Sequence, residues 1–178
     1  MLLIKWLAII IFATAVLMIV VGQLGFFRGN PPDDLGVREG RLKPPAPTPN
    51  SVSSQTGLYP EHPQQDYASI APLEVDLDGE AMLARIKTVV AATPGAQIIE
   101  NTSDYLYARF TTPTLKFVDD VEFWFDPGMN VIHVRSASRL GKSDLGVNRR
   151  RIEAIRSALQ PLSENNSDLK INAFSPIC

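Results

Sequence analysis

Three side chains in the C-terminal half of the chain have the types that acid–base chemistry requires: Asp120, Glu122 and His133. Apolar and polar residues alternate around them, which predicts two strands. Asp120 and Glu122 project from the same side of the first strand because they are two positions apart. Two carboxylates beside an imidazole are suited to general acid–base catalysis or to holding a hard metal. One interpretation of these three residues is therefore a catalytic site.

The simpler interpretation of the same side chains is ion pairing between strands on a solvated sheet face. Such cross-strand pairs are worth about 0.2–1 kcal/mol each. The predicted domain contains no histidine besides His133, so the sequence predicts no metal site, and no motif predicts a cofactor. The same face would carry the residues that alternate with the apolar ones: Tyr105, Tyr107, Arg109, Asp120, Glu122, Trp124, His133 and Arg135.

A second group of polar residues lies in the segment from Ser136 to Asn148. A loop rich in Ser, Gly and Asp that leads into a helix directs backbone N–H groups outward, as an anion site requires. Gly141-Lys142-Ser143 is similar to the end of a P-loop, but Ser136 stands where that motif needs a glycine. The segment is therefore predicted to be a ligand-binding or structural loop, with Arg135, Ser136, Ser138, Arg139, Asp144 and Asn148 as its candidate residues.

A third candidate is a basic surface on the last predicted helix. Successive helix residues are about 100° apart, and Ile152 already faces the core, so at least two neighbouring arginines should be exposed. Near a bilayer they would attract anionic lipid or an acidic protein partner. The net charge of the whole chain is −2, and no nucleic-acid partner is predicted. The arginines concerned are Arg149, Arg150, Arg151 and Arg156.

Charge is unevenly distributed along the domain. Residues 74–126 contain ten acids and four bases, whereas residues 135–156 contain seven bases and two acids. Internal pairing would explain this asymmetry without a ligand. We expect such pairs to join Arg135 or Arg139 to Asp119, Asp120 or Glu122.

The strands that position these residues are predicted at 97–100, at 104–112 and in a hairpin that turns at 127–130. The apolar sides of the hairpin coincide if Phe123 pairs with Val134 and Glu122 pairs with Arg135. A proline cannot adopt the positive φ that a two-residue type I′ turn needs at its first position, so we expect a four-residue connection.

Two helices should cover the apolar side of this sheet. Asp78 is expected to cap the first, whose apolar face is formed by Met82, Leu83, Ile86, Val89 and Val90. Ser143 or Asp144 should cap the second, with Leu145, Ile152, Ile155, Leu159 and Leu162 on its apolar stripe. Asn148 falls on that stripe, and we expect it to be a structural clamp bonded to backbone groups of residues 136–141. The predicted fold class is α+β: an antiparallel sheet of about four strands with two helices on one face.

The rest of the chain divides by composition. Residues 1–27 are almost wholly apolar and predict a transmembrane anchor. Eight of the 14 prolines lie between residues 28 and 63, so 28–66 is predicted to be a proline-rich linker, either a passive stalk or one whose residues 49–54 dock on the domain. The α+β domain is predicted at 67–162, and 163–178 should be a polar tail. The only cysteine, Cys178, excludes an internal disulfide.

Two sequence signals predict opposite orientations of the anchor. Four bases follow the span, Arg28, Arg38, Arg41 and Lys43, and this favours a cytoplasmic domain. A very short N-terminus with Lys5 ahead of the apolar run is typical of exported signal-anchors. We expect the domain on the exported, periplasmic side of a bacterial envelope.

The segments FVDDVEF, RSASRLGKSDLGVNRRRI and PNSVSS closely resemble the family named domain of unknown function 1499. The resemblance covers about Arg41 to Leu159. It implies an ordered domain that is often membrane-associated, and it implies no reaction. Members often carry a cysteine where this chain has Ser51, so any thiol role at that position is absent here.

Two functions from different classes follow. The first is a membrane-anchored, non-catalytic binding or scaffolding module at the membrane surface, with lipid contacts through the N-terminal helix. The second is a hydrolase that uses Asp120, Glu122 and His133 on the open sheet face. An open concavity joining these side chains to the 136–144 loop would favour the hydrolase, and a flat, ion-paired face would favour the module.

Overall fold

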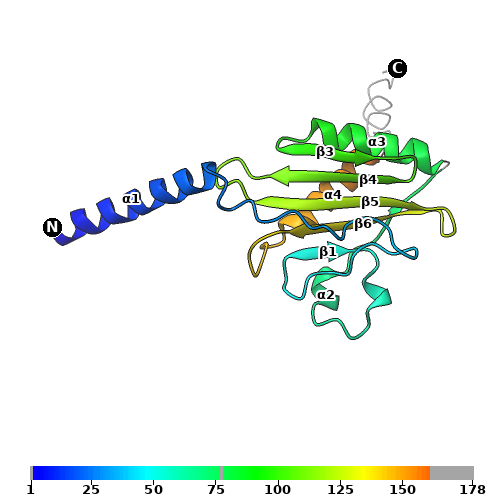
Figure 1. Cartoon of the computed structure of the whole chain (residues 1–178), viewed down its shortest axis with the longest axis horizontal. Helices are drawn as coiled ribbons and strands as arrows, with labels where there is room; N and C mark the ends of the chain where they lie inside the picture. The colour runs from blue at the N-terminus through cyan, green and yellow to red at the C-terminus, as the bar shows by residue number, and fades with distance from the viewer. Residues whose placement is uncertain (1, 77, 161–178) are drawn as a thin grey trace, which may run out of the picture.

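The computed structural model describes residues 2–76 and 78–160, and it shows a long N-terminal helix followed by an α+β domain (Figure 1). The helix, α1, runs from Leu2 to Gln23. Its 22 residues span roughly 33 Å at 1.5 Å per residue, enough for a hydrocarbon core of about 30 Å. By length and composition α1 is a candidate membrane span. The predicted polar tail, 163–178, lies outside the described residues, as does Leu162.

The domain is built on a six-stranded antiparallel sheet in the order β1-β6-β5-β4-β3, with β2 also paired to β6. The prediction of about four strands finds β3 to β6. It misses β1 and β2, because three and two residues are too few to show alternation. The strands are β1 (Ser51–Ser53), β2 (Leu73–Glu74), β3 (Ala96–Asn101), β4 (Tyr105–Thr111), β5 (Val118–Asp126) and β6 (Val131–Ser138).

The hairpin register agrees with the prediction. Phe123 pairs with Val134, and Glu122 pairs with Arg135. The connection between β5 and β6 has four residues, 127–130, of which Asn130 takes a positive φ of 52°. This register places Val121, Phe123 and Val134 on one face and Asp120, Glu122 and Arg135 on the other.

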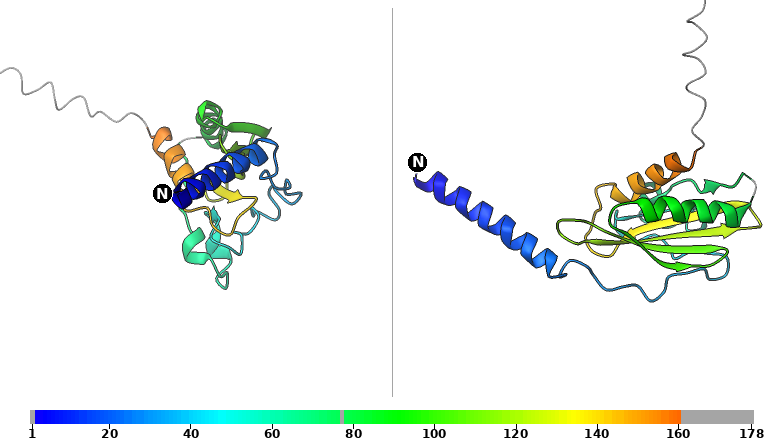
Figure 2. Two further views of the ribbon diagram at one scale, coloured as in Figure 1. Left: turned by 90° about the vertical axis from the view of Figure 1, so that its left-hand side faces the viewer. Right: turned by 90° about the horizontal axis from the view of Figure 1, so that it is seen from above.

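Two helices cover the apolar face, α3 (Gly79–Ala92) and α4 (Val147–Leu159) (Figure 2). A short α2 (Gln65–Ala68) and a 3-10 turn (Thr56–Leu58) lie beside β1. The Asp78 carboxylate accepts from the Glu80 N–H at 2.9 Å, which confirms the predicted cap of α3. The core between helices and sheet includes Leu83, Ile86, Val90, Leu106, Phe123, Val134, Ile152 and Ile155.

The start of α4 differs from the prediction. Gly146, with φ of 79°, is the residue that precedes the helix. Leu145 also has a positive φ, and it is 82% exposed, so the prediction that it joins the apolar stripe is wrong. The reason is that the chain turns sharply before Val147, which breaks the helical periodicity on which the prediction depended.

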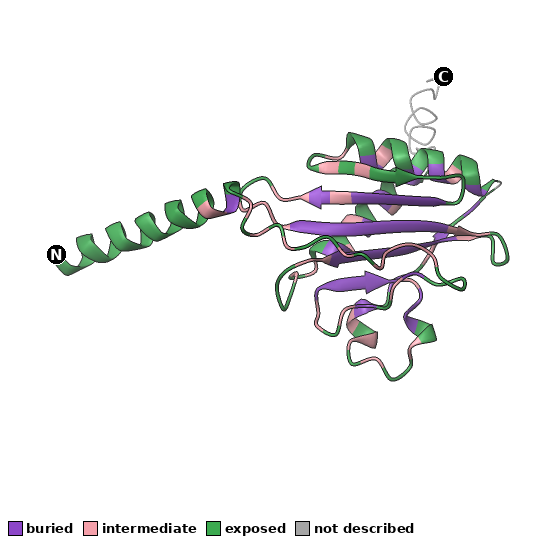
Figure 3. Cartoon of the chain, viewed as in Figure 1, coloured by how far each residue is buried: buried purple, intermediate pink, exposed green. Residues whose placement is uncertain are grey.

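The second face of the sheet is not solvated, because an extended segment covers it. We call residues 35–44 the strap; in Figure 1 it crosses in front of β5 and β6. Leu42, 2% exposed, packs there with Tyr105, Tyr107 and Trp124, and β4, β5 and β6 are largely buried (Figure 3). The expectation of an open, solvated face is therefore wrong.

The strap and β1 both lie inside the segment expected to be a linker. Val52 of β1 is 1% exposed and belongs to the main core. Gln55 holds the strap, since its Oε1 accepts from the Leu42 N–H at 2.8 Å and its Nε2 donates to the Gly40 carbonyl at 3.1 Å. A passive stalk over 28–66 is thus wrong for this part, and docking of residues 49–54 is what the structure shows. Proline-rich chain is extended, and here extended chain lies on a sheet.

The anchor helix contacts the domain at its last turn. Gln23 Nε2 donates to the carbonyls of Pro113 and Thr114, at 3.2 and 2.9 Å. A Cβ at Gly22 would lie 2.7 Å from the Leu115 carbonyl oxygen, so only glycine permits this approach. The β4–β5 loop therefore lies directly against the C-terminal end of α1.

Candidate functional site

Asp120 is a fully paired, buried carboxylate. Its two oxygens accept from Arg139 at 2.7 and 2.8 Å in a bidentate pair. The Tyr107 hydroxyl donates to the same carboxylate at 2.5 Å, and burial raises the pKa of Tyr107, which keeps the phenol protonated. Asp120 is 1% exposed. A carboxylate held by this many donors and shielded from solvent is suited to fixing strands together and has no access to a substrate.

Glu122 is held in the same way, beneath the strap. It accepts from the Tyr105 hydroxyl and from the Gly36 N–H, both at 2.8 Å, and it pairs with Arg135 at 3.3 Å. Burial and the neighbouring Glu122 charge raise the pKa of Tyr105, so this phenol also stays protonated. Glu122 is completely buried. The strap is therefore fastened to the sheet by a charged group in its interior.

These two pairs, with Arg151 bonded to Asp119, confirm the expected internal pairing of the acidic and basic segments. They also argue against the hydrolase with Asp120, Glu122 and His133. Both carboxylates are saturated by hydrogen bonds, and His133 contacts neither of them among the hydrogen bonds of the described residues.

Asn148 is a buried clamp, and it bonds side chains of the predicted 136–141 loop and also the distant Asn50. Its Nδ2 donates to the Asn50 carbonyl at 3.0 Å, to Ser138 Oγ at 3.0 Å and to Asp144 at 2.9 Å. Its Oδ1 accepts from Ser136 Oγ at 2.6 Å. Arg151 donates to the same oxygen, so the side-chain amide bonds one carbonyl and four side chains, in place of the predicted backbone groups of residues 136–141. Sequence periodicity places a residue on a face but does not identify the distant segment that packs there.

Asp144 caps α4 from outside the helix. Its carboxylate accepts from the backbone N–H groups of Gly146 and Asn148, at 3.0 and 2.8 Å, and from the Tyr67 hydroxyl. Burial would raise the pKa of Asp144, but these hydrogen bonds outweigh it and hold the pKa below the ordinary value of 3.8. The N–H groups of Gly146, Val147 and Asn148 at this helix start are thus used internally and are not offered to an anion.

Three of the four predicted surface arginines are half-buried and serve as clamps. Arg149 donates to the carbonyls of Tyr67 and Ser69, each at 2.7 Å. Arg156 does the same with Ala71 and Pro72, each at 2.7 Å. The third, Arg151, also donates to Asn148 Oδ1 at 2.7 Å and lies over the Phe110 ring. Of these four arginines only Arg150 is exposed, so the expectation of at least two exposed arginines is wrong.

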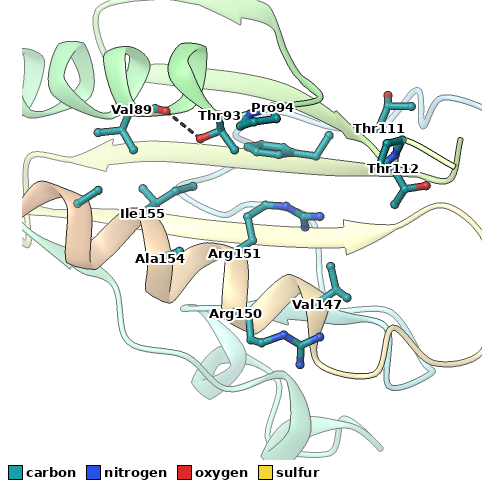
Figure 4. A pocket seen from close by; sticks show the side chains of 13 residues that line it. Val89, Thr93, Pro94, Thr111, Thr112, Val147, Arg150, Arg151, Ala154 and Ile155 are labelled. Atoms are coloured by element: carbon teal, nitrogen blue, oxygen red, sulfur yellow. Dashed lines mark hydrogen bonds between the residues drawn. The ribbon is translucent and has the colours of Figure 1, made fainter.

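An apolar groove of about 480 Å³ lies between α3, α4 and the end of β4. Figure 4 shows Val89, Thr93 and Pro94 on one side and Arg150, Arg151, Ala154 and Ile155 on the other. No acidic residue lines it. Pro113, which bonds to the anchor through its carbonyl, also lines the groove, so one end of it lies beside the end of α1.

A second cavity, of about 310 Å³, lies near the β5–β6 turn and brings together Ser54, Asp126 and His133. Ser54 Oγ lies 3.0 Å from His133 Nδ1, and His133 Nε2 lies 3.7 Å from Asp126 Oδ2. His133 is a candidate from the sequence, whereas its two neighbours are not. Ser54 is 79 positions away in a segment expected to be a linker, and no spacing signal could have joined it to the hairpin.

No group of three or more His, Cys, Asp and Glu side chains is placed to hold a metal ion within residues 2–76 and 78–160. Fold and contacts together define an α+β domain that is preceded by a helix long and apolar enough to cross a membrane. The chain belongs to the family described as protein of unknown function (DUF1499), which matches residues 41–159. No curated protein and no solved structure matches the chain.

Proposed function

We propose that this protein is a membrane-anchored binding module whose groove between α3 and α4 holds an acyl chain of an anionic membrane lipid. The observation that carries the proposal is the junction of Gln23 with Pro113 and Thr114. If α1 spans the bilayer, this junction holds one end of the groove at the membrane surface. A lipid could then reach the groove without crossing water.

The lining of the groove suits a hydrocarbon chain. Val89, Pro94, Phe110, Ala154 and Ile155 line it. A methylene group moved from water into such surroundings gains about 0.8 kcal/mol. The volume of about 480 Å³ is within the range of small-molecule sites. The small side chain of Ala154 leaves the space that a larger residue would fill.

The charge at the rim favours an anionic head group. Arg151 is committed to Asp119, and Arg150 is bonded only to the Leu145 carbonyl, at 2.9 Å, so its charge is not neutralised by an acid in the structure described. A cation held near a membrane gains about 1 kcal/mol from anionic lipid. We therefore expect preference for anionic over zwitterionic lipid, and we expect the preference to weaken as salt shortens the Debye length.

Photo-crosslinking tests this proposal. The full chain, purified in detergent, would be irradiated with phosphatidylglycerol or phosphatidylcholine that carries a diazirine on one acyl chain. Peptides from 89–94 and 147–158 should be labelled, more strongly by phosphatidylglycerol at low salt. Ala154→Phe should prevent labelling by filling the groove, whereas Ala84→Phe, at an exposed position of α3 outside the groove, should not.

Arg150→Gln tests the source of the lipid preference. It should bring the two lipids to equal labelling, while Lys87→Gln, on the exposed side of α3, should leave the preference unchanged. Equal labelling of the wild-type chain by both lipids would refute the role of Arg150. Labelling that spreads over the domain surface, or that survives Ala154→Phe, would refute the groove itself.

The proposal includes an exported location for the domain, supported by Lys5 at the N-terminal end of the apolar segment, a charge that favours the cytoplasmic side for that end. A reporter enzyme that is active only outside the cytoplasm, fused after Cys178, should be active. A silent fusion of normal abundance would place the groove against the cytoplasmic leaflet instead.

A further inference from the structure

We propose that Ser54, His133 and Asp126 form a hydrolytic site for small esters in the cavity beside the β5–β6 turn. Ser54 would be the nucleophile, His133 the proton acceptor and Asp126 a positioning residue for the imidazole. This goes beyond the proposed lipid binding, because the cavity contains side chains of the strap-covered face and the groove lies on the helix-covered face. The two proposals can fail independently.

The contacts give a consistent proton arrangement. With His133 neutral and its proton on Nε2, Ser54 donates its hydroxyl proton to Nδ1 across 3.0 Å, and Nε2–H faces Asp126 Oδ2 at 3.7 Å. In serine hydrolases the base receives the serine proton on one ring nitrogen and bonds a carboxylate with the other, and here the two nitrogens have exchanged roles. The exchange does not alter the chemistry, because both nitrogens belong to one conjugated ring.

The two groups that hold the imidazole are themselves fixed. The backbone N–H groups of Gly128 and Met129 bond to Asp126 Oδ1, at 2.8 and 3.3 Å, which leaves Oδ2 free to face His133. The ring also stacks on Trp124, with 5.5 Å between centroids. His133 thus has little freedom to turn away from Ser54.

Ser54 Oγ is also suited to lose its proton. The backbone N–H of Val134 donates to this oxygen at 2.9 Å and would stabilise the negative charge that develops on it. One lone pair of Oγ remains for attack. The serine is half-buried and lines the cavity, so a substrate can reach it.

His133, the proposed base, is neutral over the pH range in which it must accept a proton. Burial lowers the pKa of His133, and the partial opposing effect of Asp126 does not restore it to 6.5. Asp126 from β5 and Arg41 from the strap are the charged residues that line the cavity with His133. A neutral imidazole accepts a proton from Ser54, and the activity should therefore persist below pH 6.5.

The walls indicate the substrate class. Leu58 and Met129 supply apolar surface, and Arg41 supplies a cation at the edge. The volume of about 310 Å³ accommodates a short acyl group with a small leaving alcohol. An ester that carries an anionic group on one side would contact both the apolar surface and the Arg41 cation.

The reaction takes two steps. Ser54 Oγ attacks the ester carbonyl as its proton moves to His133 Nδ1, and the carbon–oxygen bond to the alcohol breaks as that oxygen takes the proton from Nδ1. Water then attacks the acyl-serine and gives one proton to Nδ1. The acid leaves as Ser54 Oγ regains this proton, so ester and water become acid and alcohol.

Two measurements on the full chain in detergent test the site: hydrolysis of p-nitrophenyl acetate, and labelling with a fluorophosphonate located by peptide mass spectrometry. We expect the phosphonate on Ser54. Ser54→Ala should abolish hydrolysis, and His133→Gln should lower kcat by about 100-fold or more, the usual contribution of a positioned base. Ser157→Ala, at an exposed position of α4, is the matched serine control and should change neither measurement.

Asp126→Asn distinguishes a positioning role from a purely structural one. Removal of its charge should lower kcat and move the acidic limb of the pH profile to lower pH, because Asp126 partly raises the pKa of His133. A folded wild-type chain without phosphonate on Ser54 and without hydrolysis would overturn the proposal. Full activity in a Ser54→Ala variant with wild-type melting would overturn it as well.

Discussion

Asn148 Nδ2 donates a hydrogen bond to the carbonyl oxygen of Asn50 at 3.0 Å, across 98 positions of sequence. Asn148 is completely buried, and Asn50 is 5% exposed. The bond joins the segment before β1 to the first turn of α4. The Asn50 side chain in turn donates from Nδ2 to the carbonyl of Gly141, in the loop before α4, at 2.8 Å. Edge strand and helix start are therefore positioned by each other.

The first prediction is that Asn148→Ala destabilises the domain by about 1–3 kcal/mol, because it leaves buried partners of the amide without hydrogen bonds. Chemical denaturation of the chain in detergent, followed by tryptophan fluorescence, measures the change. Ser157→Ala on the exposed side of α4 should lie within about 0.5 kcal/mol of wild type. An equally small effect at Asn148 would show that the clamp contributes nothing to stability.

The second prediction concerns the buried pair of Glu122 and Arg135. Glu122→Gln should destabilise the domain by about 3–5 kcal/mol, since Arg135 would remain buried without a counter-charge. Tyr105→Phe removes one hydrogen bond from the same carboxylate and should cost less, about 0.5–1.5 kcal/mol. If both variants unfold at the same denaturant concentration, the charge of Glu122 is not what holds the strap to the sheet.

The third prediction is a pH dependence that arises from His133. Its pKa is lowered in the folded state, so the unfolded chain binds more protons between the folded pKa and 6.5. Stability from this residue is complete above pH 6.5 and falls as the pH drops toward the folded pKa. Denaturation midpoints measured from pH 7 downward should decline in this window, and His133→Gln should flatten the decline. Arg41→Gln, another cavity residue, serves as the control that leaves the decline in place.

Much of the sheet could be predicted from the sequence, because its signals are local. Alternation identified β4, β5 and β6, and the need to align apolar sides fixed the pairing of Phe123 with Val134. The same register paired Glu122 with Arg135, and charge balance predicted pairing of Arg135 or Arg139 with Asp119, Asp120 or Glu122. Each inference needed only residues within one hairpin or a charge balance between two neighbouring segments.

The burial of Glu122 could not be predicted in this way. It depends on the strap, which reaches the sheet from 86 positions earlier through the Gly36 N–H. Prolines in that segment indicate extended chain, but composition does not tell whether extended chain lies in solvent or on a sheet. For the same reason, the composition of this segment did not identify Ser54 as a partner of His133. Long-range packing, rather than local pattern, decided both sites.

The last prediction follows from the strap and concerns where the folding unit begins. A chain that starts at residue 28 loses α1 but keeps the strap and β1, and it should be soluble and melt cooperatively. A chain that starts at Tyr67 matches the domain boundary predicted from sequence, yet it lacks Val52 from the core and leaves Glu122 without its cover. It should be unfolded or insoluble at low concentration.

Circular dichroism melting of both truncations tests this prediction. Loss of β1 also exposes the edge of β6, and an unpaired strand edge invites aggregation. Addition of a synthetic peptide of residues 28–66 should restore part of the cooperative melting to the shorter chain. A cooperative transition of the shorter chain alone, at the midpoint of the longer one, would show that the strap is an accessory covering and that the sheet folds without it.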